Sequence, residues 1–514
     1  MSAPTVGVEQ RIAWLLTTSR LFGADRELAK RPAFLAALAE HGITVDSPRI
    51  SRWESGLQAV PPRVVAAYET VLGLPEGWLV SVSDGLRRTF SSEQGLGKLD
   101  HRGGLGKLDQ RSDADLEALL DATVSGKATG AEWMQLADCL GRYDRVFLRA
   151  SEWEALSSRL VGELATSVGA GYQRRYEAAA ALIRHPSSQY SMMMAIGAFL
   201  VHPHNQVFSP VLTLLAEVSG EQANELVLRL MQSGIEWQRK AAASVAAAKL
   251  GRGHFAPSSM PFLEAYAAQT LRGTDPLDGG LDCIGLAAHL PQSSWTRLEA
   301  RLGHPRLQGK LIRWRATQEL IPSHKANETI NDLATAVQRA TAGTRISEPD
   351  ALLRRLLHES LLHVHKARRH YAALLLAASP YAPALASVCH DFAGGTSEFV
   401  AARAWTMLMR VGHGGLHEEV RRHALAETRS TVRPRALVNL GLCSTPLGAA
   451  GEALAAQVPE LTSSVERQAS MFALGMTGDP SLRSLAGLDG WVGDSATWWL
   501  EHGPAVHDSD LPDC

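Results

Sequence analysis

The chain has 514 residues, of which 45% are hydrophobic and 20% are charged, and its formal net charge is −2. This composition is typical of a globular protein with large cores and room for two or more domains. The near-neutral charge argues against a general polyanion binder, so any contact with nucleic acid must come from a local patch of basic residues.

Three features of the sequence bear on the cellular compartment. The cysteines have neither CxxC spacing nor any evident pairing, which is typical of unpaired thiols in a reducing environment. The N-terminal residues lack a basic segment followed by an apolar one, and the longest apolar run, Met192–Val201, is about half of the roughly 20 residues that a membrane-spanning helix needs. We therefore expect a cytoplasmic protein without a membrane partner. The cysteines are Cys139, Cys283, Cys389, Cys443 and Cys514.

Apolar spacing in the first 86 residues predicts four short helices in succession. The first covers Val8–Phe22, and the second follows Pro32 and ends near Gly42. The third is centred on residues 50–56, and an amphipathic stretch after Pro61-Pro62 gives the fourth. This order, in which a short turn separates the second helix from the third, is the order of a helix-turn-helix domain.

The third of these segments, Ile50–Gly56, is the most informative part of the chain and reads Ile-Ser-Arg-Trp-Glu-Ser-Gly. Because Ile50 and Trp53 are three residues apart, a helix would bury both on one face. Pro48 fits a first helical turn, and Gly56 can supply the left-handed residue that ends a helix. The side chains left to point outward are Ser47, Arg49, Ser51 and Arg52.

Outward arginines and serines on such a helix are suited to reading DNA. An arginine in the major groove can donate two hydrogen bonds to a guanine edge, and serines can bond to several bases. Either Asp46 or Ser47 can cap the start of the helix. Arg63, near the start of the next helix, is a candidate contact to the phosphate backbone.

Residues 8–80 resemble the lambda-repressor-like helix-turn-helix domain of the Xre family of transcriptional regulators. The resemblance rests on the scaffold segment 35–42, on Ile50–Gly56 and on the closing residues 64–74. It implies a DNA-binding domain in which an arginine of the first helix pairs with the glutamate of the third, and Arg20 and Glu54 occupy these positions. The connection between the first two helices, 24–31, is longer here than is usual in the family.

Residues 87–130 are predicted to form a flexible linker. They contain a tandem duplication, in which Gly-Leu-Gly-Lys-Leu-Asp recurs at 95–100 and 104–109. High glycine content and low hydrophobicity argue against a packed element. The segment could serve as a basic strap along a phosphate backbone, but a spacer is the better interpretation.

Residues 131–490 are predicted to form an α-helical repeat domain, followed by a C-terminal tail over 491–514. Alanine-rich helical segments with an arginine or lysine near their start recur along this region. Three of their alanines, Ala404, Ala436 and Ala469, are spaced by 32 and 33 residues. That spacing is typical of two-helix repeats in an α-solenoid of the HEAT or TPR kind. The fold class expected for the whole chain is therefore all-α, with a small helix-turn-helix domain and a large α-solenoid.

The sequence contains no coherent catalytic or metal-binding constellation. His358 and His363 are five residues apart, whereas a zinc-binding helix needs histidines four apart on one face. His202-Pro-His204 lacks a further ligand nearby, and Gly97-Lys98 does not lie in a phosphate-binding loop motif. We therefore expect a non-enzyme without cofactor or metal.

Basic residues at the helix starts permit two interpretations. Aligned on one row of helices, they would form a basic groove for a nucleic acid, a phosphorylated ligand or an acidic peptide. Alternatively, they are solvated or donate hydrogen bonds to carbonyls at neighbouring turns, which is the more common arrangement. Trp314 and Trp405, in the same region, are expected in the core.

These observations predict a transcriptional regulator that binds double-stranded DNA, most simply as a homodimer on a symmetric site. The helical-repeat domain would mediate dimerisation, sensing of a small-molecule signal, or binding of a protein partner. Two alternatives stay open. The chain could be a helical-repeat scaffold for another protein, or its solenoid could cradle duplex DNA without sequence preference in defence or repair.

Overall fold

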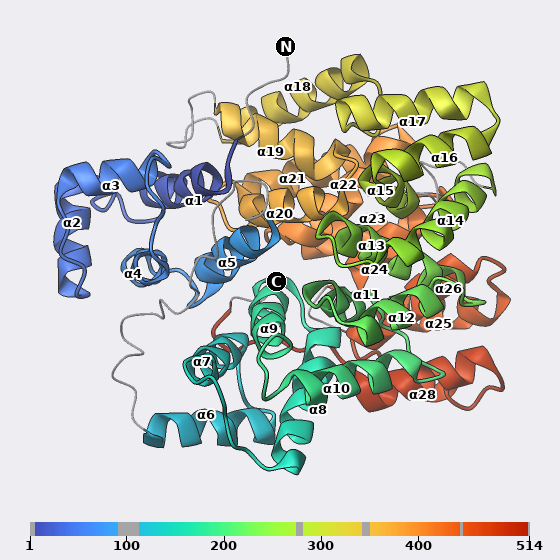
Figure 1. The fold of residues 1–514 in the computed structure, drawn as a ribbon, viewed down its shortest axis with the longest axis horizontal. Helices are drawn as coiled ribbons and strands as arrows, with labels where there is room; N and C mark the ends of the chain where they lie inside the picture. The colour runs from blue at the N-terminus through green and yellow to red at the C-terminus, as the bar shows by residue number, and fades with distance from the viewer. Residues whose placement is uncertain (1–5, 91–112, 274–280, 342–349, 443–445, 512–514) are drawn as a thin grey trace.

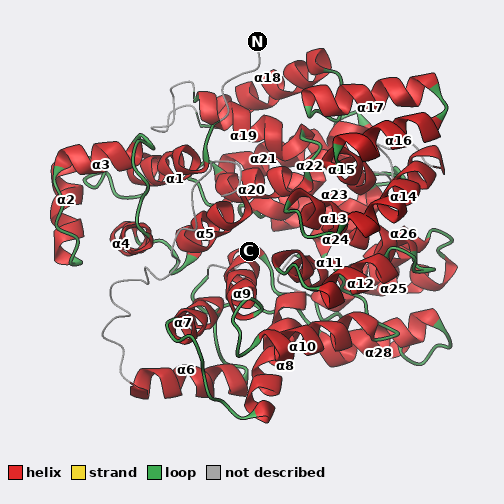
Figure 2. Cartoon of the chain, in the orientation of Figure 1, coloured by secondary structure: helices red, strands yellow, loops and turns green. Residues whose placement is uncertain are grey.

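The computed structural model describes residues 6–90, 113–273, 281–341, 350–442 and 446–511. These ranges consist of helices joined by loops (Figure 2), and the only β-type pairings within them are two isolated bridges. The predicted all-α fold is therefore confirmed.

Five helices form the N-terminal bundle within residues 6–90. The first four follow the predicted order, and α5 is a fifth helix that was not predicted. Pro62 lies at the start of α4, and Gly73, with a φ of 64°, ends it in the left-handed conformation. Glu69 of α4 then accepts hydrogen bonds from the amides of Gly77 and Val80, which are otherwise unsatisfied at the start of the next helix. The helices are α1 (Val8–Phe22), α2 (Arg31–Glu40), α3 (Ser47–Glu54), α4 (Pro62–Leu72) and α5 (Trp78–Phe90).

The prediction of a flexible linker over 87–130 is wrong at both of its ends. Residues 87–90 complete α5, in which Leu86 and Phe90 are buried. Asp113–Ser125 forms α6, which packs on the next two helices and buries Leu119. Apolar spacing on both sides of the glycine-rich stretch is sufficient for helices that find a packing partner. The tandem duplication itself lies outside the described residues.

The middle of the chain continues as short helices with tight connections. Helix α7 packs closely on α9 near the start of this part of the chain, and α13 packs on α15 further along. The helices are α6 (Asp113–Ser125), α7 (Gly130–Gly141), α8 (Ala150–Thr166), α9 (Gly169–Leu182), α10 (Gln189–Val201), α11 (Ser209–Leu212), η3 (Thr213–Glu217), α12 (Glu221–Leu230), α13 (Glu236–Gly251), η4 (Pro257–Ser259), α14 (Met260–Gly273), α15 (Leu281–His289), α16 (Gln292–Leu302), α17 (Pro305–Thr317) and α18 (Ser323–Ala340).

Alternate helices of the C-terminal half pack on one another in chain order. Helix α20 packs on α22, α22 on α24, and α24 on α26, which in turn packs on α28. The helices are α19 (Ala351–Leu362), α20 (Lys366–Ala377), α21 (Ala382–Ala393), α22 (Glu398–Val411), α23 (His417–Ala426), α24 (Arg433–Leu440), α25 (Ala449–Gln457), η5 (Val458–Glu460), α26 (Ser464–Met476), α27 (Leu482–Leu485) and α28 (Trp491–His502).

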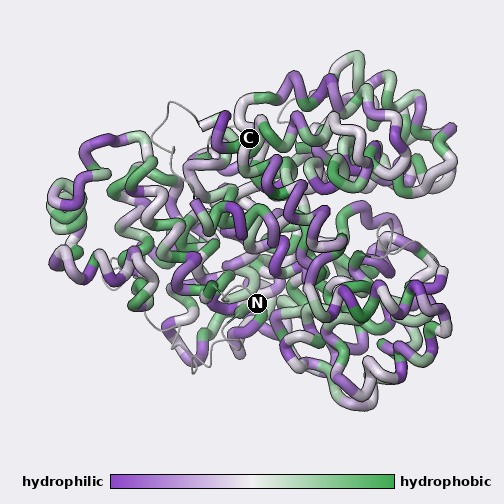
Figure 3. Tube along the Cα trace, turned by 90° about the horizontal axis from the view of Figure 1, so that it is seen from above, coloured by the Kyte–Doolittle hydropathy of each residue, from purple (hydrophilic) through white to green (hydrophobic). Residues whose placement is uncertain are grey.

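The alanines that define the sequence spacing lie at these helix contacts. Ala404, Ala436 and Ala469 are buried in α22, α24 and α26, where a small side chain permits close approach of neighbouring helices. Trp314 and Trp405 are buried as predicted. Hydrophobic and hydrophilic residues alternate along most of these helices (Figure 3), as expected for helices that bury one face.

The prediction of a C-terminal tail over 491–514 is wrong for residues 491–511. Trp491–His502 forms α28, and both Trp498 and Trp499 are buried. Asp508, from the segment expected to be an acidic end, is buried and accepts hydrogen bonds from Arg174 at 2.7 Å and Arg175 at 2.6 Å. Two arginines of α9 therefore hold Asp508, which lies 333 and 334 residues later in the sequence.

The N-terminal bundle is packed directly against the rest of the molecule through α1 (Figure 1). Arg11 forms a buried ion pair with Glu359 of α19 at 2.8 Å. Trp14 donates a hydrogen bond to Asp350, and its ring stacks on that of Tyr381.

A second set of contacts attaches α5. Arg88 pairs with Glu177 and Glu217, and Phe90 makes an edge contact with Tyr371 of α20. Residues 1–86 are thus not separated from the helical body by a structural boundary, because α5 crosses residue 86 and packs on α9 and α20.

Two further features of the described ranges concern membranes and thiols. No helix there is both long and apolar enough to cross a bilayer. Cys283 and Cys389 are buried free thiols, and Cys139 is also buried, whereas Cys443 and Cys514 lie outside the described residues.

Candidate nucleic-acid interface

Helix α3 is held by its two predicted anchors. Ile50 and Trp53 are both buried, and α3 packs on α1 and α2. Figure 1 shows α2 and α3 at one edge of the molecule, away from the helices of the C-terminal half. A helix with one buried face at such an edge leaves its opposite face accessible to a large partner.

Both ends of α3 are closed by local hydrogen bonds that the sequence indicated. Asp46, one of the two capping candidates, accepts a hydrogen bond from the amide of Arg49 at 3.0 Å. At the other end Gly56 has a φ of 70°. The Gly56 and Leu57 amides donate to the carbonyls of Trp53 and Arg52, which forms a Schellman motif.

The predicted Arg20–Glu54 pair is present and is almost fully buried. Arg20 donates from Nε and Nη2 to the two carboxylate oxygens of Glu54 at 2.6 and 2.7 Å. Tyr68 of α4 donates to the same carboxylate, and burial followed by the Glu54 charge raises the pKa of the Tyr68 hydroxyl above its usual range. Glu54 is the only acidic residue within α3, and these contacts direct its charge inward.

The longer connection between α1 and α2 does not disturb this arrangement. Arg20 uses its remaining nitrogen, Nη1, to donate to the Ala29 carbonyl within the connection at 2.6 Å. Thr17 of α1 donates to the Glu54 carbonyl, so α1 contacts the end of α3 at a second point. One guanidinium group therefore fixes both the third helix and the unusual connection.

The predicted DNA-contacting residues differ in how they are placed. Arg49, Ser51 and Arg52 are exposed on α3, and Arg63 is exposed in the first turn of α4. Ser47 is half-buried at the first position of α3, and is therefore less accessible than predicted. The Arg49, Ser51 and Arg52 side chains are called the outward face of α3 below.

The outward face of α3 carries positive charge without an acidic neighbour in direct contact. Among the described residues, neither Arg49 nor Arg52 forms an ion pair, and the Arg49 guanidinium lies over the Trp53 ring at 5.8 Å. Such a contact orients the side chain while its N–H groups remain available. The arrangement can donate hydrogen bonds to phosphate oxygens or to base edges.

One exposed residue next to this face was not identified from the sequence. Leu57, directly after the glycine that ends α3, is 80% exposed. An apolar side chain in that position can contact sugar or thymine methyl groups. The sequence does place a leucine directly after the glycine that ends the helix. A leucine at that position is also common as a packing residue, so the pattern alone does not predict exposure.

The histidine motif on α19 serves structural contacts. His358 lies 3.0 Å from Glu319, Glu359 pairs with Arg11, and His363 lies beyond the last residue of the helix. His202 and His204 are exposed at the end of α10 and in the turn that follows it. In the described ranges, no group of three or more histidine, cysteine, aspartate or glutamate residues is placed to hold a metal ion.

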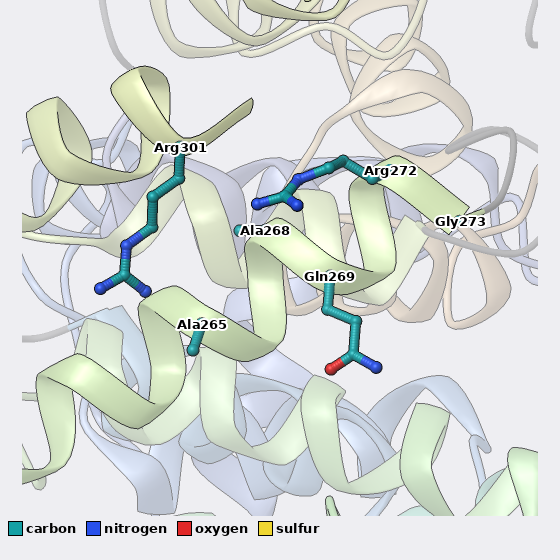
Figure 4. Close-up of a pocket in the computed structure, with 6 residues that line it drawn as sticks. All are labelled: Ala265, Ala268, Gln269, Arg272, Gly273 and Arg301. Carbon is teal, nitrogen blue, oxygen red and sulfur yellow. The ribbon is translucent and has the colours of Figure 1, made fainter. Parts of the chain in front are cut away.

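A hollow of about 360 Å³ lies on the surface between α14 and α16 (Figure 4). Arg272 and Arg301 border it, both are exposed, and Figure 4 shows Arg301 extending from its own helix toward α14. The remaining lining residues are small or amide side chains and glycine, so the hollow lacks a buried polar group that would position a ligand.

Basic residues at the helix starts make the carbonyl contacts that were the more common expectation. Arg403 donates to the carbonyls of Leu361 and Ser360, and Arg369 donates to those of His363 and Val364. These contacts join α20 and α22 to the end of α19. They place the guanidinium groups without neutralising them, since a carbonyl carries no net charge.

Comparison of the chain with protein-family models and with curated proteins found no match.

Proposed function

We propose that the chain is a sequence-specific DNA-binding protein, most simply a transcriptional regulator, that inserts α3 into the major groove of duplex DNA. The observation that carries the proposal is the outward face of α3. Its arginines are exposed and unpaired among the described residues, while the single carboxylate of the helix is buried against Arg20. Positive charge at an exposed helix suits a partner that is itself a large polyanion.

The neighbouring residues support the same geometry. A recognition helix must be rigid to position side chains against bases, and α3 is capped at both ends and anchored by Ile50 and Trp53. Arg63, at the start of α4, would contact the phosphate backbone and set the register of α3 in the groove. The resemblance to the Xre helix-turn-helix domain favours this mode of binding.

The rest of the chain would supply the second element of a regulator. A single small module binds DNA weakly, so we propose that two copies bind a symmetric site. The α-solenoid-like stack of α20, α22, α24, α26 and α28 would provide a surface for dimerisation, for an effector or for a protein partner, in a cytoplasmic protein.

The proposal is tested by recovery of genomic DNA fragments with the purified full-length chain, followed by gel retardation of the recovered sequence. Arg49→Ala and Arg52→Ala should each weaken specific retention about 10-fold or more, because each removes a base or phosphate contact. Arg306→Ala, an exposed arginine on α17, is the matched control and should have no effect.

Two results would contradict the proposal. One is the absence of any enriched fragment at low salt, and the other is unchanged retention by both α3 variants. The second result, with folding intact by circular dichroism, would favour the scaffold alternative.

A further inference from the structure

A cavity of about 250 Å³ lies in the helical body, and six of its thirteen lining residues carry cationic side chains. Helices α13, α15, α20, α22 and α24, which extend from the centre toward the right in Figure 1, form most of its wall. Asp282 is the only acidic side chain among the described residues that line it. The cations define the basic cavity: Lys240, Lys366, Arg369, Arg403, Arg410 and Arg435.

The regular spacing of the lining residues shows that the cavity is a product of helix geometry. On α20 the wall consists of residues 366, 369, 370 and 373, and on α22 it consists of residues 403, 406, 407 and 410. Both sets follow i, i+3, i+4 and i+7, which is one face of an α-helix. Two neighbouring helices thus present the same face to one space. Helix α22 has a cation at each end of that face, and α20 has Lys366 and Arg369 in its first turn.

Some of these cations are held by the protein, and others are not. Arg369 and Arg403 donate to carbonyls at the end of α19, and Lys240 pairs with Glu236 at 2.6 Å. In contrast, Lys366 and Arg410 form neither a hydrogen bond nor an ion pair within the described residues. Two half-buried cations on neighbouring helices therefore face the cavity without an ion pair to any described residue.

The electrostatic consequences are visible in the titration of the lining groups. Burial, followed by the positive charge of Arg410, lowers the pKa of His370 well below its usual value. Burial also lowers the pKa of Lys366 and of Arg410, and it lowers that of Arg369 to about 10. Asp282 opposes the shifts of Lys366 and Arg369 but does not cancel the effect of burial, so a bound anion would add to this compensation.

We propose that the basic cavity binds a small molecule that carries two or more linked phosphate groups. Six cations against one carboxylate favour a ligand with several negative charges in a small volume, and phosphate oxygens match the N–H groups of arginine and lysine. The volume suits a small ligand and not a duplex, whose major groove alone is about 12 Å wide. This proposal does not depend on DNA binding by α3.

Isothermal titration calorimetry of the full-length chain tests the site, with pyrophosphate and ATP as probes and citrate as a polycarboxylate comparison. We expect one binding site, with citrate at least 10-fold weaker than the better phosphate probe. The double variant Lys366→Met/Arg410→Met should weaken phosphate binding at least 10-fold. The matched control Lys325→Met/Arg339→Met removes two exposed cations from α18 and should leave binding unchanged.

A second variant keeps every charge and fills the space instead. Thr406 lines the cavity, so Thr406→Phe should abolish probe binding while all six cations remain. If the double variant does not fold, as judged by circular dichroism, Thr406→Phe still tests whether the cavity binds the phosphate probes.

Several outcomes would overturn the proposal. These are no binding of either phosphate probe at millimolar concentration, equal loss in the control, citrate binding as tight as phosphate binding, or full binding by a folded Thr406→Phe variant. Retardation of a 30-base-pair duplex that is lost in the double variant but kept in Arg52→Ala would instead assign the cavity to nucleic acid.

Discussion

The outward face of α3 and the basic cavity use the same residue types in opposite surroundings. Arg49 and Arg52 are exposed at the edge of the molecule, where water solvates them at little cost. Lys366 and Arg410 are half-buried between helices, where burial lowers their pKa. The surroundings of a cation, and not its residue type, therefore determine which anion it can bind. An exposed row suits a long polyanion, and a recess suits a small one.

The two regions also differ in how the protein treats carboxylates. Near α3, Glu54 is removed from the outward face by Arg20 and Tyr68. In the cavity, carbonyl oxygens place the guanidinium groups of Arg369 and Arg403, so that their charge is kept. Helix α20 connects the regions, since its Tyr371 contacts Phe90 of α5 while its Lys366 lines the cavity.

Among the variants considered, Arg20→Met is expected to lower the stability of the fold most. Loss of this buried guanidinium leaves Glu54 buried without its partner, which should lower the free energy of unfolding by about 3 to 5 kcal/mol. Urea denaturation measures the change. Lys30→Met, which breaks an exposed ion pair with Glu27, should cost less than about 1 kcal/mol. Equal stability of the two variants would mean that the buried pair does not hold α3.

Acid should loosen the attachment of α5 to the helical body. Burial alone would raise the pKa of Glu217, but Arg88 and Arg252 lower it to about 2 from an ordinary 4.5. The pairing therefore stabilises the fold above pH 4.5, and its contribution of about 3 kcal/mol is lost as the pH falls toward 2.

Unfolding free energies measured across this pH range check the effect. Glu217→Gln should flatten the dependence on pH and lower stability at neutral pH. Glu221→Gln, an exposed neighbour on α12, should reproduce the wild-type curve. If the Glu217→Gln curve is as steep as that of the wild type, other carboxylates cause the acid sensitivity.

Alanine substitutions at Gly42 and Gly56 should lower stability less, and they distinguish the cost of backbone strain from the cost of a steric clash. Gly42 and Gly56 both have positive φ angles, of 78° and 70°. A Cβ on Gly56 would lie 2.8 Å from Gln10 Cα in α1, whereas a Cβ on Gly42 would meet nothing within 4 Å. We expect Gly42→Ala to cost about 1 kcal/mol and Gly56→Ala about 2 kcal/mol or more, by thermal denaturation. A similar loss of stability in the two variants would show that α1 moves to accommodate the added methyl group at Gly56.

The smallest effect concerns the salt dependence of DNA binding and compares the two regions directly. Arg52→Ala should reduce the slope of log affinity against log salt by about 1, because one fewer counter-ion is released. Lys366→Met should leave the slope unchanged if its charge never meets the duplex. Fluorescence anisotropy with a labelled operator at several salt concentrations measures both slopes, and a reduced slope for Lys366→Met would remove the distinction between the regions.

Local sequence patterns determined much of what is seen around α3. The spacing of Ile50 and Trp53, the capping residue Asp46 and the left-handed Gly56 are all features of a few consecutive residues, and the structure contains each of them. Such features act through bonds within one or two helical turns, so that they can be recognised without knowledge of distant residues. The all-α class follows in the same way from helical periodicity along the chain.

Tertiary structure alone decided where the segments end and which charges stay uncompensated. Residues 113–125 pack on α7 and α8, and residues 491–502 pack on α26 and α27, and sequence composition does not encode such packing partners. The basic cavity likewise depends on α20 and α22 turning equivalent faces toward one space, while Asp282 is its only acidic lining residue in the described part of the chain. Burial of a charge is a property of its whole surroundings, so only the folded arrangement could reveal it.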